Sequence, residues 1–138
     1  MSIATILITD TDRRRLGSSL ERAADEGGRH DREFVALETD LDFAFSVLAE
    51  EVPGDVVTMN STVEICDLDG GETESFTLAY PEDADSSRGW ISVLDPLGRA
   101  LLGRRIGEVV QVAVSAGPRR VRVERLCYQP ERAGHFDR

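Results

Sequence analysis

Four carboxylates surround one predicted turn in the first third of the chain, those of Asp25, Glu26, Asp31 and Glu33. Carboxylate oxygens are ligands that Mg²⁺ prefers, so two acids on one short turn could place a metal ion. Acidic residues near helix ends on a solvent-exposed turn give the same pattern without binding anything. We favour the second interpretation and predict no metal site and no catalytic residue at this turn.

The other residue types that carry chemistry are isolated in the sequence. Neither His30 nor His135 has a Ser or Cys nucleophile nearby. Cys66 and Cys127 lack metal-ligand spacing and are too few for a disulfide framework, so we expect small core residues with inert thiols. The glycine pairs are typical of turns, not of a phosphate-binding loop. The sequence therefore predicts no bound cofactor.

The acidic turn is predicted to join two helices. Residues 9–12 offer a cap and an acidic first turn, and Asp31 can cap a second helix. The apolar residues of that second helix lie three and four apart, as in a heptad: Phe34, Leu37, Leu41, Ala44 and Leu48. We predict a short antiparallel helical hairpin, a coiled coil within residues 1–52, with Phe43 and Phe45 packing on the domain that follows.

Beyond Pro53 and Gly54 the apolar pattern changes to period two. Val63 and Ile65 alternate with polar residues, and residues 69–71 are typical of a hairpin turn. Further strands are expected at residues 76–80, 109–114 and 121–126. Paired strands of this kind with one helix predict an α+β fold, in which residues 53–138 form an antiparallel-sheet domain with one short helix.

That short helix is predicted within residues 91–110. Asp95 can cap a helix that opens with Pro96, whose missing N–H costs nothing at the first helical position. Three leucines give the helix one apolar face. Gly103 and Gly107 can adopt the positive φ that ends a helix and turns the chain.

The stretch from residue 91 to residue 110 resembles the signature of the Gre factors, the bacterial transcript-cleavage factors GreA and GreB. Three further segments follow the family in the same order along the chain. Residues 56–63 and 126–134 resemble its Rnk-type branch, and residues 80–85 resemble the segment before the signature helix. Asp95 stands where Gre factors often carry Ser, and Gly98 replaces the usual Ala, but the turn chemistry survives both changes. The resemblance implies an FKBP-like fold for residues 53–138.

The resemblance also implies a partner, RNA polymerase. Gre factors grip a coiled coil of the β′ subunit at the secondary-channel entrance, and the matching loop here is Leu94, Asp95 and Pro96, with Arg99 just beyond. Tip acids of the much longer Gre hairpins help hold a second Mg²⁺ for RNA hydrolysis. A helix over residues 10–26 is only about 25 Å long. We therefore expect a non-catalytic transcription regulator that competes with Gre-type factors.

Two enzymatic alternatives stay open at this point. One is a transcript-cleavage factor of the GreA/GreB type, in which the tip acids would work on the polymerase active centre. The other is an FKBP-like prolyl isomerase, which needs an aromatic-lined apolar pocket. Few aromatic residues are available to the C-terminal domain for such a pocket: Phe76, Tyr80, Trp90, Tyr128 and Phe136.

Composition narrows the partner classes. The 138 residues carry 16 basic and 26 acidic side chains, a net charge of −10, which argues against unaided DNA binding. The charge is uneven, because residues 99–138 hold nine arginines against four acids, whereas residues 67–85 hold seven acids and no base. No apolar run approaches the roughly 18 residues of a membrane helix. We expect a cytoplasmic protein.

Overall fold

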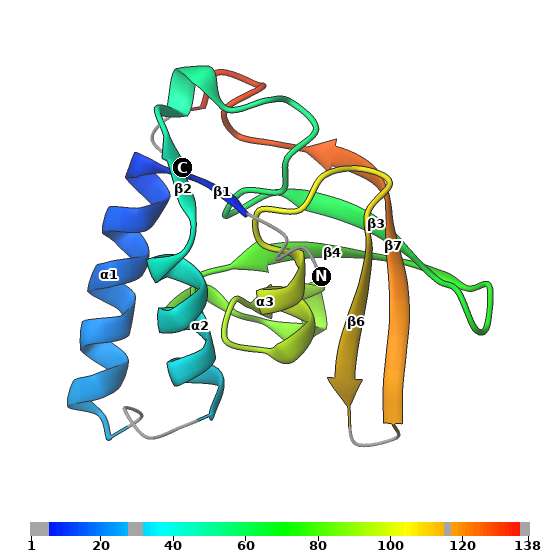
Figure 1. Cartoon of the computed structure of the whole chain (residues 1–138), viewed down its shortest axis with the longest axis horizontal. Coiled ribbons are helices and arrows are strands. Elements are labelled where there is room, and N and C mark those ends of the chain that lie inside the picture. Colours follow the sequence, from blue (N-terminus) through cyan, green and yellow to red (C-terminus); the bar gives the residue numbers. More distant parts are fainter. Residues whose placement is uncertain (1–5, 28–31, 115–116, 136–138) are drawn as a thin grey trace.

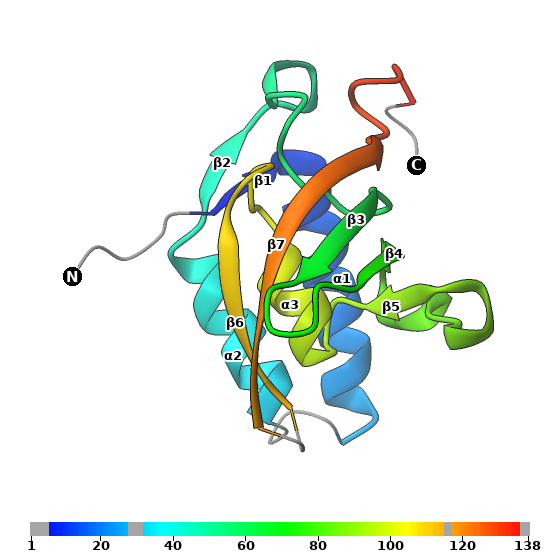
Figure 2. The ribbon, with the colours of Figure 1, turned by 90° about the vertical axis from the view of Figure 1, so that its right-hand side faces the viewer.

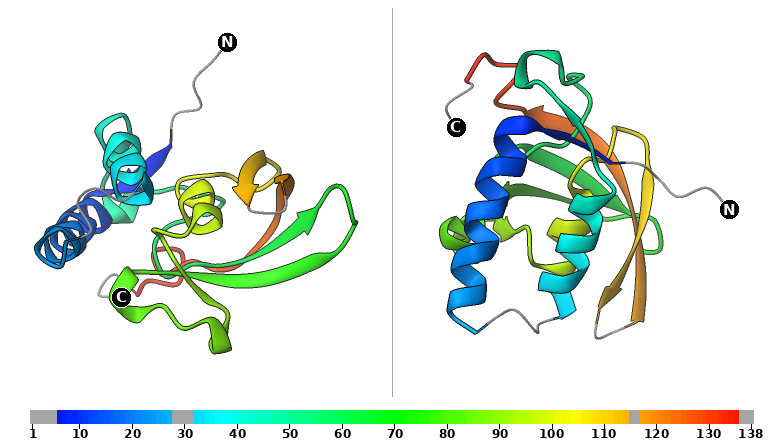
Figure 3. Two further views of the ribbon diagram at one scale, coloured as in Figure 1. Left: turned by 90° about the horizontal axis from the view of Figure 1, so that it is seen from below. Right: turned by 60° about the vertical axis from the view of Figure 1, so that its left-hand side comes forward.

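The computed structural model describes residues 6–27, 32–114 and 117–135. Two helices, α1 (Asp10–Asp25) and α2 (Arg32–Asp42), lie side by side next to a curled five-stranded sheet (Figure 1). A third helix, α3 (Pro96–Leu101), lies between α2 and the sheet, as the view from below also shows (Figure 3). The architecture is therefore mixed α+β, as predicted.

The start of α1 follows from its sequence. The Thr9 hydroxyl oxygen accepts a hydrogen bond from the Asp12 N–H at 3.0 Å, which satisfies one of the free donors of the first turn. The predicted cap is thus confirmed. Thr9 also ends β1 (Leu7–Thr9), which pairs in parallel with β2 (Phe45–Val47). Neither of these two short strands was predicted from the sequence.

The second helix is shorter than predicted. Phe34, Leu37 and Leu41 are buried as expected, but α2 ends at Asp42 and the last position of the predicted heptad, Leu48, is half exposed. The cause is the pairing with β1, which requires an extended chain over residues 45–47. The contact expected from Phe43 and Phe45 is also wrong, since these side chains are 75% and 65% exposed. The expected cap, Asp31, lies outside the described residues.

The larger sheet has the strand order β5-β4-β3-β7-β6. Three of its neighbouring pairs are antiparallel, but β4 and β5 run parallel, so the expectation of a purely antiparallel sheet is corrected to a mixed one. Figure 2 shows the long β7 crossing the middle of the sheet beside β6. The strands are β3 (Thr62–Asp67), β4 (Thr73–Ala79), β5 (Trp90–Ser92), β6 (Val109–Val114) and β7 (Gly117–Tyr128).

The parallel β4–β5 pair depends on the segment between these two strands. Two single-turn 3₁₀ helices, Pro81–Asp83 and Ser86–Arg88, carry the chain away from the sheet and back. A third, Ala49–Glu51, leads from β2 towards the sheet. A hairpin turn would have reversed the chain and given an antiparallel pair.

One continuous core joins the helices to the sheet. Leu16 and Leu37 from the helices, Leu101 from α3 and Ile65 from the sheet are each no more than 1% exposed and belong to the same buried cluster. The two-helix unit is therefore packed on the sheet domain. Burial of this apolar surface is what stabilises two helices that are too short to persist alone.

Ion pairs along β3 and β7 offset part of the charge imbalance seen in the sequence. Arg119 binds Asp67 at 2.8 Å and Glu74 at 2.9 Å. Arg120 and Arg125 likewise reach carboxylates at the turn after β3 and on β3. The basic C-terminal strand therefore faces the acidic segment instead of forming a free basic patch.

Two further findings concern cysteines and membranes. Cys127 is exposed and Cys66 is half-buried, so the expectation of two core cysteines is wrong for Cys127. Within the described ranges, no helix combines the length and the hydropathy needed to cross a bilayer.

Candidate functional site

The loop that starts α3 is held by its own hydrogen bonds. The Asp95 carboxylate accepts from the Leu97 N–H at 2.9 Å, and Pro96 is the first helical residue. The Ser92 hydroxyl accepts from the Leu94 N–H at 3.0 Å, and the Ser92 carbonyl accepts from the Asp95 N–H at 2.9 Å. The predicted cap and proline position are confirmed. Such a loop has little conformational freedom to lose when it binds a partner.

Close packing beneath this loop fixes the position of α3. Gly98 lies against the backbone of Ser92, so closely that a β-carbon at residue 98 would overlap the Ser92 carbonyl oxygen. Leu97 and Leu101 are buried on the same side of the helix. Asp95 is exposed, whereas Leu94 and Pro96 are half-buried. The loop therefore offers a carboxylate and apolar surface on a rigid base.

Arg99 joins this loop to the two-helix unit. Its Nη1 lies 3.1 Å from an Asp40 carboxylate oxygen on α2. Its buried Nε has no hydrogen-bond partner within the described part of the chain. The guanidinium thus keeps unused donor capacity after pairing with Asp40.

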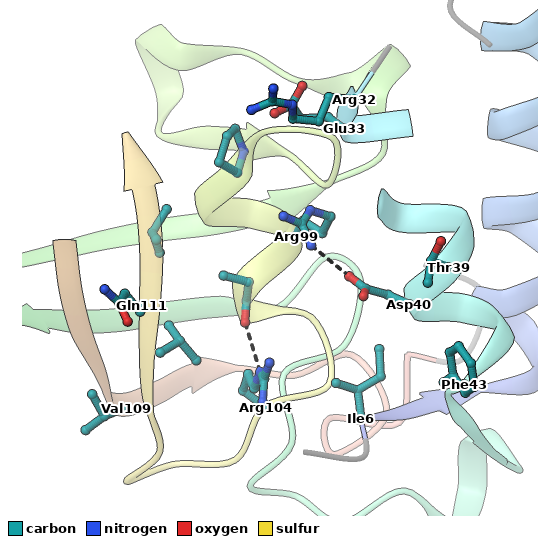
Figure 4. A pocket seen from close by; sticks show the side chains of 14 residues that line it. Ile6, Arg32, Glu33, Thr39, Asp40, Phe43, Arg99, Arg104, Val109 and Gln111 are labelled. Carbon is teal, nitrogen blue, oxygen red and sulfur yellow. Dashed lines mark hydrogen bonds and ion pairs between the residues drawn. The ribbon is translucent and has the colours of Figure 1, made fainter. Parts of the chain in front are cut away.

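A groove lies between α2 and β6, with α3 forming its floor (Figure 4). Its volume is about 620 Å³. From the predicted residues it brings together Pro96, Arg99 and Glu33, while Leu94 and Asp95 lie outside its lining. Most of the other lining residues come from α2, α3 and β6: Arg32, Thr39, Asp40, Phe43, Ala100, Arg104, Val109, Val110, Gln111 and Val112.

The acids of the predicted tip do not form one cluster. Asp25 and Glu26 are exposed at the end of α1, where the Glu26 N–H bonds back to the Arg22 carbonyl oxygen. Glu33 belongs to the first turn of α2 and lines the groove instead. Asp31 lies outside the described residues. Within residues 6–27, 32–114 and 117–135, no three His, Cys, Asp or Glu side chains are grouped as metal ligands would be.

A buried carboxylate connects α1 to the sheet domain. Asp12 is 1% exposed and accepts hydrogen bonds from the Met59 N–H at 3.0 Å and the Tyr80 hydroxyl at 3.3 Å. Burial raises the pKa of Asp12 to about 7, and nearby Glu131 adds to this, whereas Arg15 and the two hydrogen bonds lower it. Burial, followed by the Asp12 charge, also raises the pKa of Tyr80.

The burial of this carboxylate was not predicted from the sequence. Along its own helix, Asp12 is simply an acid of the first turn. The available signal was a Thr-x-x-Asp pattern next to an apolar stretch, which places the acid close to the core side of the helix start. The partners Met59 and Tyr80 are 47 and 68 residues away, so the spacing could not reveal them.

Comparison with known proteins identifies relatives of the whole chain. Residues 52–128 match the family model described as "Transcription elongation factor, GreA/GreB, C-term". The chain is 40% identical over 137 residues to the regulator of nucleoside diphosphate kinase of Escherichia coli K12, covering 99% of this chain and 98% of that protein. It is 35% identical over 106 residues to GreA of Thermotoga neapolitana, covering 77% and 67% of the two chains.

A solved structure agrees with these matches. The GreA/GreB elongation factor from Nitrosomonas europaea is 36% identical and superposes with a TM-score of 0.74, covering 91% of this chain and all of that one. The signature around α3, the order of the four family-like segments along the chain and the relatives all indicate the same family. The chain belongs to the GreA/GreB family of transcription elongation factors and is similar along its whole length to the regulator of nucleoside diphosphate kinase.

Proposed function

We propose that this protein is a non-catalytic transcription regulator that binds RNA polymerase at the secondary channel and competes there with Gre-type factors. The observation that carries the proposal is the loop of residues 94–99. It keeps the family's proline-started helix and presents an exposed Asp95 on a rigid base. In this proposal the loop docks on the β′ subunit.

The dimensions of the two-helix unit support a role without RNA cleavage. At 1.5 Å per residue, the 16 residues of α1 span about 24 Å, and the 11 residues of α2 span about 16 Å. We infer that these helices form a short antiparallel hairpin lying in or over the channel mouth. Its acids would then stop short of the active centre.

The rest of the proposal follows from the same resemblance. Residues 1–52 and 53–138 are proposed as two folding regions, the second with an FKBP-like arrangement. We propose no direct DNA contact, because the arginines of β7 named above pair with carboxylates of β3, of β4 and of the turn between them. A cytoplasmic location is the setting in which such a factor would meet its polymerase.

The decisive experiment measures affinity for RNA polymerase core enzyme. We expect a Kd in the micromolar range or below, and displacement by an excess of GreA. Replacing both Asp95→Ala and Pro96→Ala should weaken binding at least tenfold, because the loop loses its cap and its fixed φ. Asp83→Ala, an exposed acid on the 3₁₀ turn after β4, is the matched control and should bind normally.

A second assay separates binding from catalysis. Backtracked transcription complexes should release no additional 3′ RNA fragment when the protein is added. Fragment release that disappears in the variant Asp25→Asn with Asp31→Asn would show a cleavage factor instead. Unchanged polymerase affinity of the Asp95 and Pro96 variant would refute the docking loop itself.

A further inference from the structure

Among the described residues the strand β6 is an edge of the sheet, because it pairs with β7 alone in the strand order. An edge strand exposes backbone donors and acceptors that can pair with another extended chain. The described part of β6 includes no charged residue and reads Val-Val-Gln-Val-Ala-Val. It lacks the charges, prolines and short length by which sheet edges are usually protected from pairing.

The ladder with β7 shows which backbone groups of β6 are free. The Gly107 N–H bonds to the Val123 carbonyl oxygen, and the Val123 N–H bonds to the Glu108 carbonyl oxygen, the pattern of a bulge with a positive-φ glycine. Pairing alternates from this point along an antiparallel ladder. Val110 and Val112 therefore bond with β7, whereas Val109 and Gln111 direct their N–H and C=O groups to the open edge.

These free groups face the groove between β6 and α2. The four consecutive residues 109–112 all line it, although neighbouring side chains of a strand point to opposite faces. Because their side chains alternate between faces, the feature that all four residues present to the groove is the backbone edge of the strand. Val109 is 51% exposed and Gln111 is exposed, and across the groove Phe43 is 75% exposed (Figure 4).

The elements beside β6 argue against pairing with a second sheet. On the side of β6 away from β7 lie α3 and then α2, in both the front view and the rotated view (Figures 1 and 3). A second copy pairing through its own β6 would bring β7 and the rest of its sheet towards α2. A single extended segment, which has no further strands attached, avoids this collision.

The charge of the lining favours a segment that carries a carboxylate. Three arginines, Arg32, Arg99 and Arg104, line the groove against two acids, Glu33 and Asp40, in a chain whose total charge is −10. Arg99 pairs with Asp40 and Arg104 with Glu108. Among the described residues Arg32 makes no hydrogen bond or ion pair, so its charge remains available.

We propose that the groove between β6 and α2 binds an extended, apolar segment of a partner protein, carrying at least one carboxylate, which adds to β6 as a sixth strand. Backbone bonds to Val109 and Gln111 would supply affinity, and alternate side chains would lie against Phe43 and α3. This surface shares Pro96 and Arg99 with the polymerase-docking loop, whereas Asp95 lies outside its lining.

The test uses the full chain as bait for a phage-displayed library of random twelve-residue peptides. Selected peptides should be apolar, extended and acidic at one or more positions. In fluorescence anisotropy, Gln111→Pro should weaken the best peptide at least tenfold, because proline removes the N–H at the open edge and leaves the β7 ladder intact. Gln111→Ala keeps that N–H and should bind within twofold of the unmodified protein. Arg32→Ala should weaken acidic peptides about threefold.

Amide hydrogen exchange makes the test independent of how well the proline variant folds. In the unmodified protein, saturating peptide should slow exchange at Val109 and Gln111. The proposal is overturned if no peptide is enriched, if Gln111→Pro binds as well as Gln111→Ala, or if these two amides are unaffected. Sedimentation could also show a dimer of the unmodified protein that is lost in Gln111→Pro. That result would overturn the proposal and assign the edge to self-association. Loss of polymerase binding leaves this test unchanged, because the peptide assay contains no polymerase.

Discussion

At its first turn α3 presents an exposed carboxylate, while at its last turn it is buried against β1. Asp95 caps the first turn and remains open to solvent. Leu102 and Gly103 at the other end are buried, and the Gly103 N–H bonds to the Val57 carbonyl oxygen at 2.8 Å. One six-residue helix thus separates the proposed docking surface from the buried contact of Gly103 with Ile6 and Leu7.

The largest effect is expected at the buried end. Gly103 has φ of +78°, and an added β-carbon would lie 2.5 Å from the Ile6 Cβ and 2.9 Å from the Leu7 carbonyl oxygen. Backbone strain and overpacking together should lower the free energy of unfolding by about 3 kcal/mol in Gly103→Ala. Urea denaturation measures this loss. Gly70→Ala, at a turn with open space around it, should change stability by less than about 0.5 kcal/mol.

A second effect, on the pH dependence of stability, tests the buried contact of Asp12 on α1 with Met59 and Tyr80. The pKa of buried Asp12 is raised to about 7, so the folded state holds a proton that the unfolded chain, with its ordinary pKa of 3.8, has released. Stability from this group is therefore complete at low pH and is lost as pH rises towards the folded pKa. Between pH 6 and pH 8 the free energy of unfolding should fall by about 1 kcal/mol.

The control for this titration is Asp12→Asn. Asparagine still accepts from Met59 and cannot ionise, so the difference between the two proteins isolates Asp12 from the facing groups Tyr80, Arg15 and Glu131. Parallel stability curves for both proteins from pH 6 to pH 8 would contradict the assignment.

A smaller effect on stability is expected from the Arg99–Asp40 ion pair, and polymerase affinity separates this pairing from the role of Arg99 in docking. Both side chains are about one-third exposed, so solvent screening limits their coupling to about 0.5 kcal/mol in a double-mutant cycle. Asp40→Ala should leave polymerase affinity within twofold, whereas Arg99→Ala should reduce it. Equal losses for both variants would mean that the ion pair, and not the arginine, supports docking.

The smallest effect belongs to the ion-paired outer face of the sheet. Arg125 is 68% exposed and lies 3.3 Å from Glu64. Exposed pairs of this kind contribute little, so Arg125→Ala should change stability by less than about 0.5 kcal/mol and should not alter polymerase affinity. A large loss of affinity would move the binding surface from α3 to β7.

The region around α3 could be predicted because its signals are local. A capping acid, a proline at the first helical position and a glycine after the last turn all act within a few residues of themselves. The same holds for the Asp10 end of α1 and for the turn between β3 and β4. Which end of α3 faces a partner stays a prediction from the family resemblance of this stretch.

The elements that were missed depend on contacts between distant residues. The β1–β2 pair joins Leu7 to Phe45, and each strand has only three residues, too few for a periodic pattern. The heptad spacing continues to Leu48 although the helix stops at Asp42. The spacing of apolar residues does not reveal that the chain after Asp42 pairs with β1. The groove and the Asp12 contacts arise only when α1, α2 and the sheet are packed together.

The parallel β1–β2 pair has a consequence for how the length of the two-helix unit could change. It fixes both ends of the segment from Leu7 to Val47 at the sheet domain, whatever lies at the far end. Each added turn in both helices would extend the reach by about 5.4 Å, and closing a longer loop costs little, about 0.6 kcal/mol per doubling of length. The length of the two helices could therefore change while their attachment through β1 and β2 stays the same.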